Sequence, residues 1–256
     1  MHRNWQRRRI DSANLSGTAA ETAPKNKHTP MINETVQKLI EAEDKAAWLF
    51  KTIHERGLIV PGKTERELNA EVFALALELL GIKKYWHKRI VRAGKNTLLP
   101  YKENPPDLVL QEDDILFFDF GPVLEDWEAD VGRTYVIGND PKKIKLMNDV
   151  ELAWKEGLNF YKDNRQTITG AAFYNYTKEL AQKYGWHYGN IHCGHLIGNF
   201  PHEKLVGEEV INYIHPDNHE LMSNKDKNGN ERHWIYEIHL IDKESEIGGF
   251  FEQLMH

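Results

Sequence analysis

Cysteine is almost absent from this sequence, since Cys193 is the single one among 256 residues. An internal disulfide is therefore excluded, which is typical of proteins in reducing compartments, and we expect a cytoplasmic protein. His192 and His195 lie close to Cys193 in the sequence, so a thiol nucleophile is one interpretation. Neighbours on a strand point to opposite faces, however, and a small buried thiol is the favoured interpretation.

Long apolar runs are also lacking, and no stretch approaches the ~20 residues that span a bilayer. Positive charge is in deficit, with 33 Lys and Arg against 39 Asp and Glu and a formal net charge of −6. Nucleic-acid binding needs a basic patch, so neither nucleic acid nor a membrane is an expected partner. The basic start is followed by no apolar stretch, so we do not expect it to be a secretory signal. We expect residues 1–30 to form a disordered tail, with a transit peptide as the alternative.

Residues 31–256 are expected to form a single catalytic domain, because the chain is 40% hydrophobic and long enough for a sizeable core. Apolar residues at helical spacing predict a helix over 33–57 and a second helix within 59–81. In the second helix, Thr64 and Glu67 have the spacing of a capping box, and Gly81 ends it. Strands are predicted over 87–94, 115–123 and 130–138, with the acidic segment 124–129 as a turn.

The same order of elements then returns, with helices over 142–161 and 167–185 and strands over 190–198, 233–242 and 248–256. This repetition indicates two similar halves packed into one α+β domain. The polar segment 203–230, with Pro216 and Gly229, predicts an irregular loop near the site that the strands form.

Acidic residues interrupt otherwise apolar strands twice in each half, at Asp119, Asp130, Glu237 and Glu252. A buried ionised carboxylate must be paired, protonated or bound to metal, because its desolvation is costly. Ion pairs with Arg133 or Arg232 are one alternative, but the strands carry too few cations for all four. His195 adds a nitrogen donor. The set favours two divalent ions (Mn²⁺, Fe²⁺, Co²⁺ or Zn²⁺) held by Asp119, Asp130, His195, Glu237 and Glu252.

Several motifs in order resemble those of the pita-bread metallopeptidases (peptidase family M24), which include methionine aminopeptidases, Xaa-Pro peptidases and creatinases. They are PGKTERELNAEV, FFDFG with Asp130 eleven residues after Asp119, GHLIGNFPHE, IYEIHL and FFEQL. The resemblance covers about residues 33–256 and implies a curved antiparallel sheet with two pseudo-symmetric halves backed by helices. It also implies a two-metal hydrolase, an aminopeptidase or dipeptidase of Xaa-Pro type that cleaves an amide bond with a metal-bridging hydroxide.

The resemblance further implies roles for single residues. It places Asp119 on one metal, Asp130 and Glu252 as bridges, and His195 and Glu237 on the second metal. His202 matches the second histidine of the family motif and is expected to stabilise the oxyanion without binding metal. Glu237 is also expected to carry a proton to the leaving amine.

One position departs from the family pattern, because Pro100 stands where typical members have a substrate-binding histidine. The substrate-binding function of that histidine is therefore either absent or supplied elsewhere, and His87 and Tyr101 are the candidates to bind substrate in its place. The expected partner is a peptide or small amide, and a homodimer is compatible with the resemblance. Two alternatives stay open: a relative that hydrolyses a small non-peptide C–N bond, and a metal-free module that binds peptides or proteins.

Overall fold

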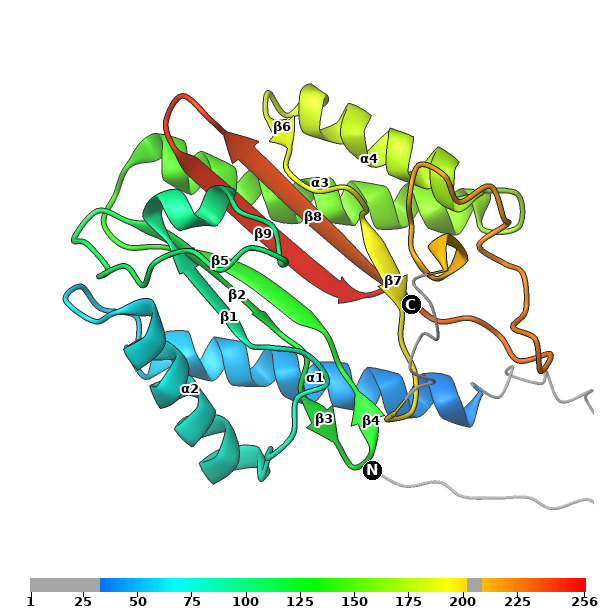
Figure 1. Ribbon diagram of the computed structural model, residues 1–256, viewed down its shortest axis with the longest axis horizontal. Coiled ribbons are helices and arrows are strands. Elements are labelled where there is room, and N and C mark those ends of the chain that lie inside the picture. The colour runs from blue at the N-terminus through cyan, green and yellow to red at the C-terminus, as the bar shows by residue number, and fades with distance from the viewer. Residues whose placement is uncertain (1–32, 202–208) are drawn as a thin grey trace, which may run out of the picture. The chain divides into compact units, whose positions relative to one another are not determined.

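The computed structural model describes residues 33–201 and 209–256, so the expected tail over 1–30 and His202 lie outside the described residues (Figure 1). The described chain begins with α1 (Glu34–Glu55) and α2 (Glu65–Leu80), close to the predicted bounds. The capping box of α2 is confirmed, since Thr64 and Glu67 each accept a hydrogen bond from the other's backbone N–H. Gly81 ends α2 in the left-handed region at φ 65°, where glycine is not strained.

The main sheet takes strands from both halves of the chain. The first half supplies β1 (Ile90–Ala93), β2 (Ile115–Phe120) and β5 (Val131–Val136). The second half supplies β6 (His187–Tyr188), β7 (Gly194–Leu196), β8 (Trp234–Asp242) and β9 (Ile247–Leu254). Their order is β1-β2-β5-β9-β8-β6, with β7 also paired to β8, and the pairs are antiparallel. The two halves therefore meet at β5 and β9.

Two features of the strands differ from the prediction. The acidic segment expected as a plain turn forms a hairpin of β3 (Val123–Leu124) and β4 (Trp127–Glu128). Its tip residues, Glu125 and Asp126, have positive φ angles of 50° and 66°, which suit a tight hairpin turn. Strand β6 was not predicted, because two residues are too few to show an alternating pattern.

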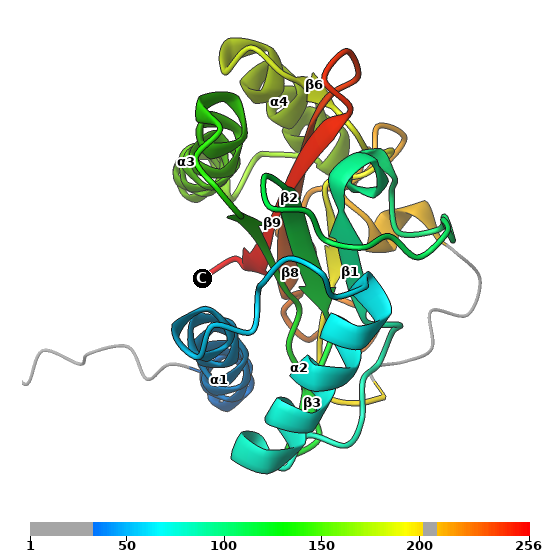
Figure 2. The same ribbon diagram turned by 90° about the vertical axis from the view of Figure 1, so that its left-hand side faces the viewer.

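The helices build one hydrophobic cluster for each half. Helices α1 and α3 (Pro141–Asn164) lie on the same side of the sheet (Figure 2). Helix α2 packs beside β1, and α4 (Gly170–Lys183) packs beside β6. In the first half Phe50 of α1 packs on Phe118 of β2, and in the second Trp154 of α3 packs on Tyr236 of β8. Side chains alternate along a strand, so the chain neighbours of Phe118 and Tyr236 face the opposite side of the sheet.

The segment between β7 and β8 is irregular in its described part, as predicted. It contains one short 3-10 helix, η2 (Val210–Asn212). The backbone N–H of Ile214 donates to the carbonyl of Gly194 at 2.9 Å, and the N–H of Cys193 donates back to Ile214 at 2.9 Å. The segment therefore lies along β7. None of the helices in residues 33–201 and 209–256 combines the length and the hydropathy of a transmembrane span.

Candidate metal centre

One row of residues crosses the sheet and carries three of the predicted ligands. Asp119 on β2 lies opposite Gly132 on β5, Gly132 lies opposite Glu252 on β9, and Glu252 lies opposite Glu237 on β8. Asp130 precedes Gly132 by two residues, so alternation turns it to the same face. A Cβ at Gly132 would lie 2.9 Å from the Cβ of Glu252, so only glycine fits between the carboxylate-bearing strands.

Asp119 is buried on the site face of β2, with 7% of its surface exposed. Its neighbours Phe118 and Phe120 point the other way, into the first-half cluster. Burial raises the pKa of Asp119 to about 7, and the negative charges of Asp130 and Glu237 add to the rise against the effect of His87. An ionised carboxylate at this place therefore needs a cation beside it.

Asp130 lies between two histidines. Its Oδ1 is 3.0 Å from Nε2 of His87, and its Oδ2 is 3.0 Å from Nε2 of His195. Burial raises the pKa of Asp130, but the charge of His87 and the hydrogen bonds from both imidazoles outweigh it and hold that pKa well below its usual range. Asp130 is therefore an ionised carboxylate with one imidazole on each oxygen.

His195 reaches the site from β7. Its Nδ1 lies 2.9 Å from the carbonyl oxygen of Leu196, and since a carbonyl only accepts, we assign the proton to Nδ1. Its Nε2 also lies 3.8 Å from Oε1 of Glu252. Burial lowers the pKa of His195, but the Asp130 and Glu252 carboxylates overcome this and raise it well above its usual value.

Glu237 and Glu252 face each other directly across β8 and β9. Oε1 of Glu237 and Oε2 of Glu252 are buried without a hydrogen-bond partner among the described residues. Nδ1 of His192 lies 2.5 Å from Oε1 of Glu237 but without hydrogen-bond geometry. Burial, with the charges of Asp130 and Asp119, raises the pKa of Glu252 well above its usual value. Like charges placed opposite each other destabilise a sheet unless a cation lies between them.

The predicted arginine partners do not neutralise these carboxylates. The Arg133 guanidinium donates to the backbone carbonyls of Gly132 and Glu252, each at 2.8 Å, and its charge lies over the Phe251 ring. In the described part of the chain, the ion pairs of the four carboxylates are all with histidines. Orphaned buried oxygens and a carboxylate and imidazole donor set fit divalent metal ions.

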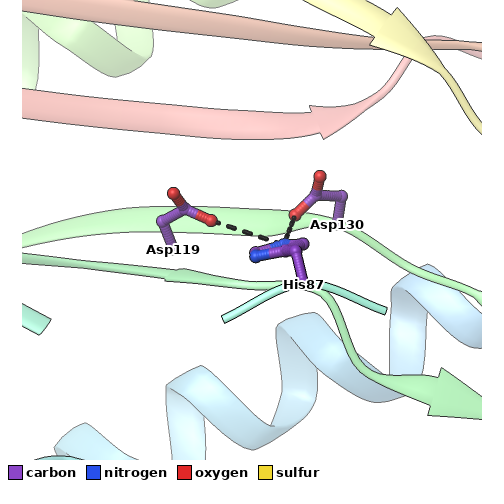
Figure 3. Close-up of side chains that lie close together, drawn as sticks. All are labelled: His87, Asp119 and Asp130. Atoms are coloured by element: carbon purple, nitrogen blue, oxygen red, sulfur yellow. Dashed lines mark hydrogen bonds and ion pairs between the residues drawn. The ribbon is translucent and has the colours of Figure 1, made fainter. Parts of the chain in front are cut away.

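His87 also belongs to this cluster, although it was predicted only as a substrate-binding residue. Figure 3 shows its ring pointing at both Asp119 and Asp130. Its Nε2 is 3.6 Å from Oδ1 of Asp119. Burial lowers the pKa of His87, but the two aspartates raise it to about 9. Among the described residues, two groups of three side chains lie close enough together to hold a metal ion, His87–Asp119–Asp130 and Asp130–His195–Glu252.

Tyr101 lies at the edge of the cluster, with 39% of its surface exposed. Its ring stands edge-on to His87 at 5.5 Å, and its hydroxyl accepts from the N–H of Lys88 at 3.3 Å. Pro100, Tyr101, Arg92 and Asp119 line a small cavity of about 20 Å³ that also reaches Glu237. Tyr101 is therefore exposed at this cavity, whereas Asp119 and Glu237 are buried.

Glu43 on α1 is a buried carboxylate that the sequence interpretation missed. It accepts from the N–H of Leu254 at 3.0 Å and from the N–H of Asp130 at 3.4 Å, and so connects the two ligand-bearing strand ends. Burial raises the pKa of Glu43 to about 8. The signal was present in the sequence, because Glu43 interrupts the apolar stripe between Leu39 and Ala46.

Cys193 is fully buried in the second-half cluster, as the favoured interpretation predicted. Burial raises the pKa of its thiol well above the ordinary value. The nearby histidines face the carboxylates, with His192 at Glu237 and His195 at Asp130. A buried thiol of this kind is not activated as a nucleophile.

The family model of metallopeptidase family M24 matches residues 37–228. A Xaa-Pro dipeptidase of Pyrococcus horikoshii is 28% identical over 170 residues, which cover 66% of this chain and 46% of that protein. A Xaa-Pro dipeptidase of Pyrococcus furiosus is 28% identical over 172 residues, covering 66% of this chain and 47% of that protein. The chain thus spans about half the length of these relatives.

Solved structures of similar fold include a dipeptidase from Pyrococcus horikoshii, with a TM-score of 0.66 and 25% identity over 86% of this chain and 56% of that one. A methionine aminopeptidase from Rickettsia prowazekii has a TM-score of 0.62 and 17% identity, over 86% of this chain and 91% of that one. The pita-bread fold predicted from the sequence motifs is therefore confirmed.

Proposed function

The chain belongs to metallopeptidase family M24, and from this premise we propose that residues 31–256 form one catalytic domain, a two-metal hydrolase of Xaa-Pro type. The proposed substrate is a peptide with proline after the scissile bond, by likeness to the Xaa-Pro dipeptidases. The proposed ligands are Asp119, Asp130, His195, Glu237 and Glu252.

The convergence of four buried carboxylates on one face carries this proposal. Oxygens of Glu237 and Glu252 lack hydrogen-bond partners among the described residues, and the cationic partners of all four groups there are imidazoles. Four carboxylates balance two divalent ions in charge. An oxygen-rich set with imidazole suits Mn²⁺, Fe²⁺, Co²⁺ or Zn²⁺.

Two bound ions supply a water of lowered pKa and a polarised substrate carbonyl. Asp130 orients the His195 imidazole, whose Nδ1–H is held by the Leu196 carbonyl, so that Nε2 points into the site. Glu237 is also the proposed carrier of the proton that goes to the leaving amine. His202, proposed to stabilise the oxyanion, lies outside the described residues.

Metal stoichiometry followed by a substrate comparison tests this function. The protein is loaded with Mn²⁺, freed of unbound ion by gel filtration, and its metal is counted by mass spectrometry. We expect about two ions per chain. The loaded protein should hydrolyse Ala-Pro and Met-Pro dipeptides faster than Ala-Ala, and a chelator should stop turnover. No retained Mn²⁺, Co²⁺ or Fe²⁺ would instead favour a metal-free peptide-binding module.

Hydrolysis of a small non-peptide amide is the second candidate. It is favoured by Pro100, which offers no side-chain donor to a peptide and lines the small cavity beside Asp119. A metal-loaded protein that hydrolyses formyl or carbamoyl amides but none of the dipeptides would select this candidate. Both candidate functions predict the same metal content, so only the substrate comparison distinguishes them.

A further inference from the structure

Two histidines approach Asp130 in the same way from opposite sides. Nδ1 of His87 lies 2.7 Å from the carbonyl of Lys88, and Nδ1 of His195 lies 2.9 Å from the carbonyl of Leu196. Each ring thus donates Nδ1–H to the backbone carbonyl of the next residue and turns Nε2 inward. Metal-binding histidines are commonly held this way, because the carbonyl sets the tautomer and the ring orientation.

Each Nε2 also lies near a second carboxylate oxygen that belongs to its own half. Nε2 of His87 is 3.6 Å from Asp119, and Nε2 of His195 is 3.8 Å from Glu252. Ligand atoms on one ion lie at most about twice the metal–ligand distance apart, or roughly 4 Å. Both histidines therefore meet this limit toward two carboxylates.

Gly121 leaves the space that His87 occupies. A Cβ at Gly121 would lie 2.4 Å from Nε2 of His87 and 2.4 Å from Nε1 of Trp86. The Trp86 ring stands edge-on to His87 at 4.4 Å, and its Nε1–H is fixed on the carbonyl of Ala129 at 3.0 Å. The inward position of His87 is therefore built into the packing on both sides of the ring.

We propose that His87 is a metal ligand at the Asp119–Asp130 position, so that each half contributes two carboxylates and one imidazole. The inference rests on the proposed two-metal function and adds a ligand to it. Without His87 this metal position has only oxygen donors. A neutral nitrogen donor shifts the metal preference of the position from Mn²⁺ toward Co²⁺ and Zn²⁺. His87 is then a determinant of which metal the first position holds.

His87→Gln distinguishes two roles of His87, metal ligand and hydrogen-bond donor. The Gln amide can still donate to Asp130 but has no imidazole nitrogen to bind a metal ion. Calorimetric titration of the metal-free protein with Co²⁺ should give two binding events in the unchanged protein. In His87→Gln we expect one event to weaken by at least about tenfold, since even outer-shell changes cost this much. His195→Gln should weaken the other event, and His187→Gln, at an exposed site, should weaken neither.

Gly121→Ala provides a second variant that keeps His87 but pushes its ring aside, and it should weaken the same event as His87→Gln. The preference for Co²⁺ over Mn²⁺, measured by competition, should fall in both variants. Two unchanged binding events in a folded His87→Gln or Gly121→Ala protein overturn the ligand role and leave the two-metal function standing. If the unchanged protein binds no metal, both proposals fail together.

Discussion

The two halves of the sheet bring equivalent groups to the site by different local means. In the second half, Glu237 and Glu252 are direct register partners on long strands. In the first half, Asp119 is on a strand, whereas Asp130 lies just before β5 and reaches the site from a strand end. Gly132 lets β5 and β9 approach closely where the two halves meet. The two halves thus supply similar metal-binding groups from different positions on their strands.

The surroundings of the two carboxylate pairs also differ. Both oxygens of Asp130 face imidazoles, whereas Glu237 and Glu252 each keep a buried oxygen without a hydrogen-bond partner in the described structure. The second half is therefore the less satisfied one without metal. Burial and register thus show that these carboxylates need positive charge beside them. The number of nearby imidazoles decides how much of that charge the protein supplies and how much is left for a metal ion.

Asp130→Asn should have the largest effect, because Asp130 contacts a histidine from each half, His87 and His195. We expect turnover to fall by more than about 100-fold, since losing a shared ligand exceeds the 10–100-fold cost of outer-shell changes. Metal content and dipeptide hydrolysis would be measured together. Asp163→Asn, at an exposed position of α3, is the matched control and should change neither. Full turnover in Asp130→Asn contradicts the metal assignment.

Gly132→Ala tests the close approach of the halves. Its Cβ would lie 2.9 Å from the Cβ of Glu252, and overpacking of this kind costs about 1–3 kcal/mol. We expect lower stability in urea denaturation and weaker metal binding, because β9 must move. Gly249→Ala is the control, since its nearest contact is Leu146 at 3.3 Å. Equal effects of the two substitutions would show that the spacing at Gly132 is unimportant.

Glu43→Gln probes the connection between the halves through pH. The pKa of Glu43 rises from 4.5 to about 8 by burial, so the folded chain keeps a proton that the unfolded chain loses. Stability should therefore fall as pH rises from about 4.5 to 8, by up to about 1.4 kcal/mol per pH unit. Relative to Glu43→Gln, the metal-free protein should lose stability across this window in urea titrations. Parallel pH profiles would contradict the raised pKa.

Alkylation of Cys193 should have the smallest effect. The thiol is fully buried and its pKa is raised by burial, so iodoacetamide should leave the native protein unmodified by mass spectrometry. Activity should persist after this treatment and disappear with a chelator. Rapid inactivation by the alkylating agent would instead support the interpretation of Cys193 as a catalytic nucleophile.

The carboxylates were predictable from the sequence because each interrupts an apolar strand pattern, as Asp119 does within FFDFG. His87 precedes β1 in a segment without such a pattern, and its contact with Asp130 spans 43 residues. No local signal distinguishes it from an ordinary surface histidine. Glu43 is intermediate, since its place in an apolar helical stripe is visible but its partners, Leu254 and Asp130, are not.

By itself the sequence determined most of the helices and strands, the two halves, the family resemblance and the five candidate ligands, because periodicity and spaced motifs are local properties of the chain. Only the tertiary structure decided that β5 pairs with β9, that Gly132 lies between Asp119 and Glu252, and that His87 joins the cluster. These contacts depend on which strands become neighbours and how closely they approach. Long-range packing sets both, and a pattern within one strand carries no information about it.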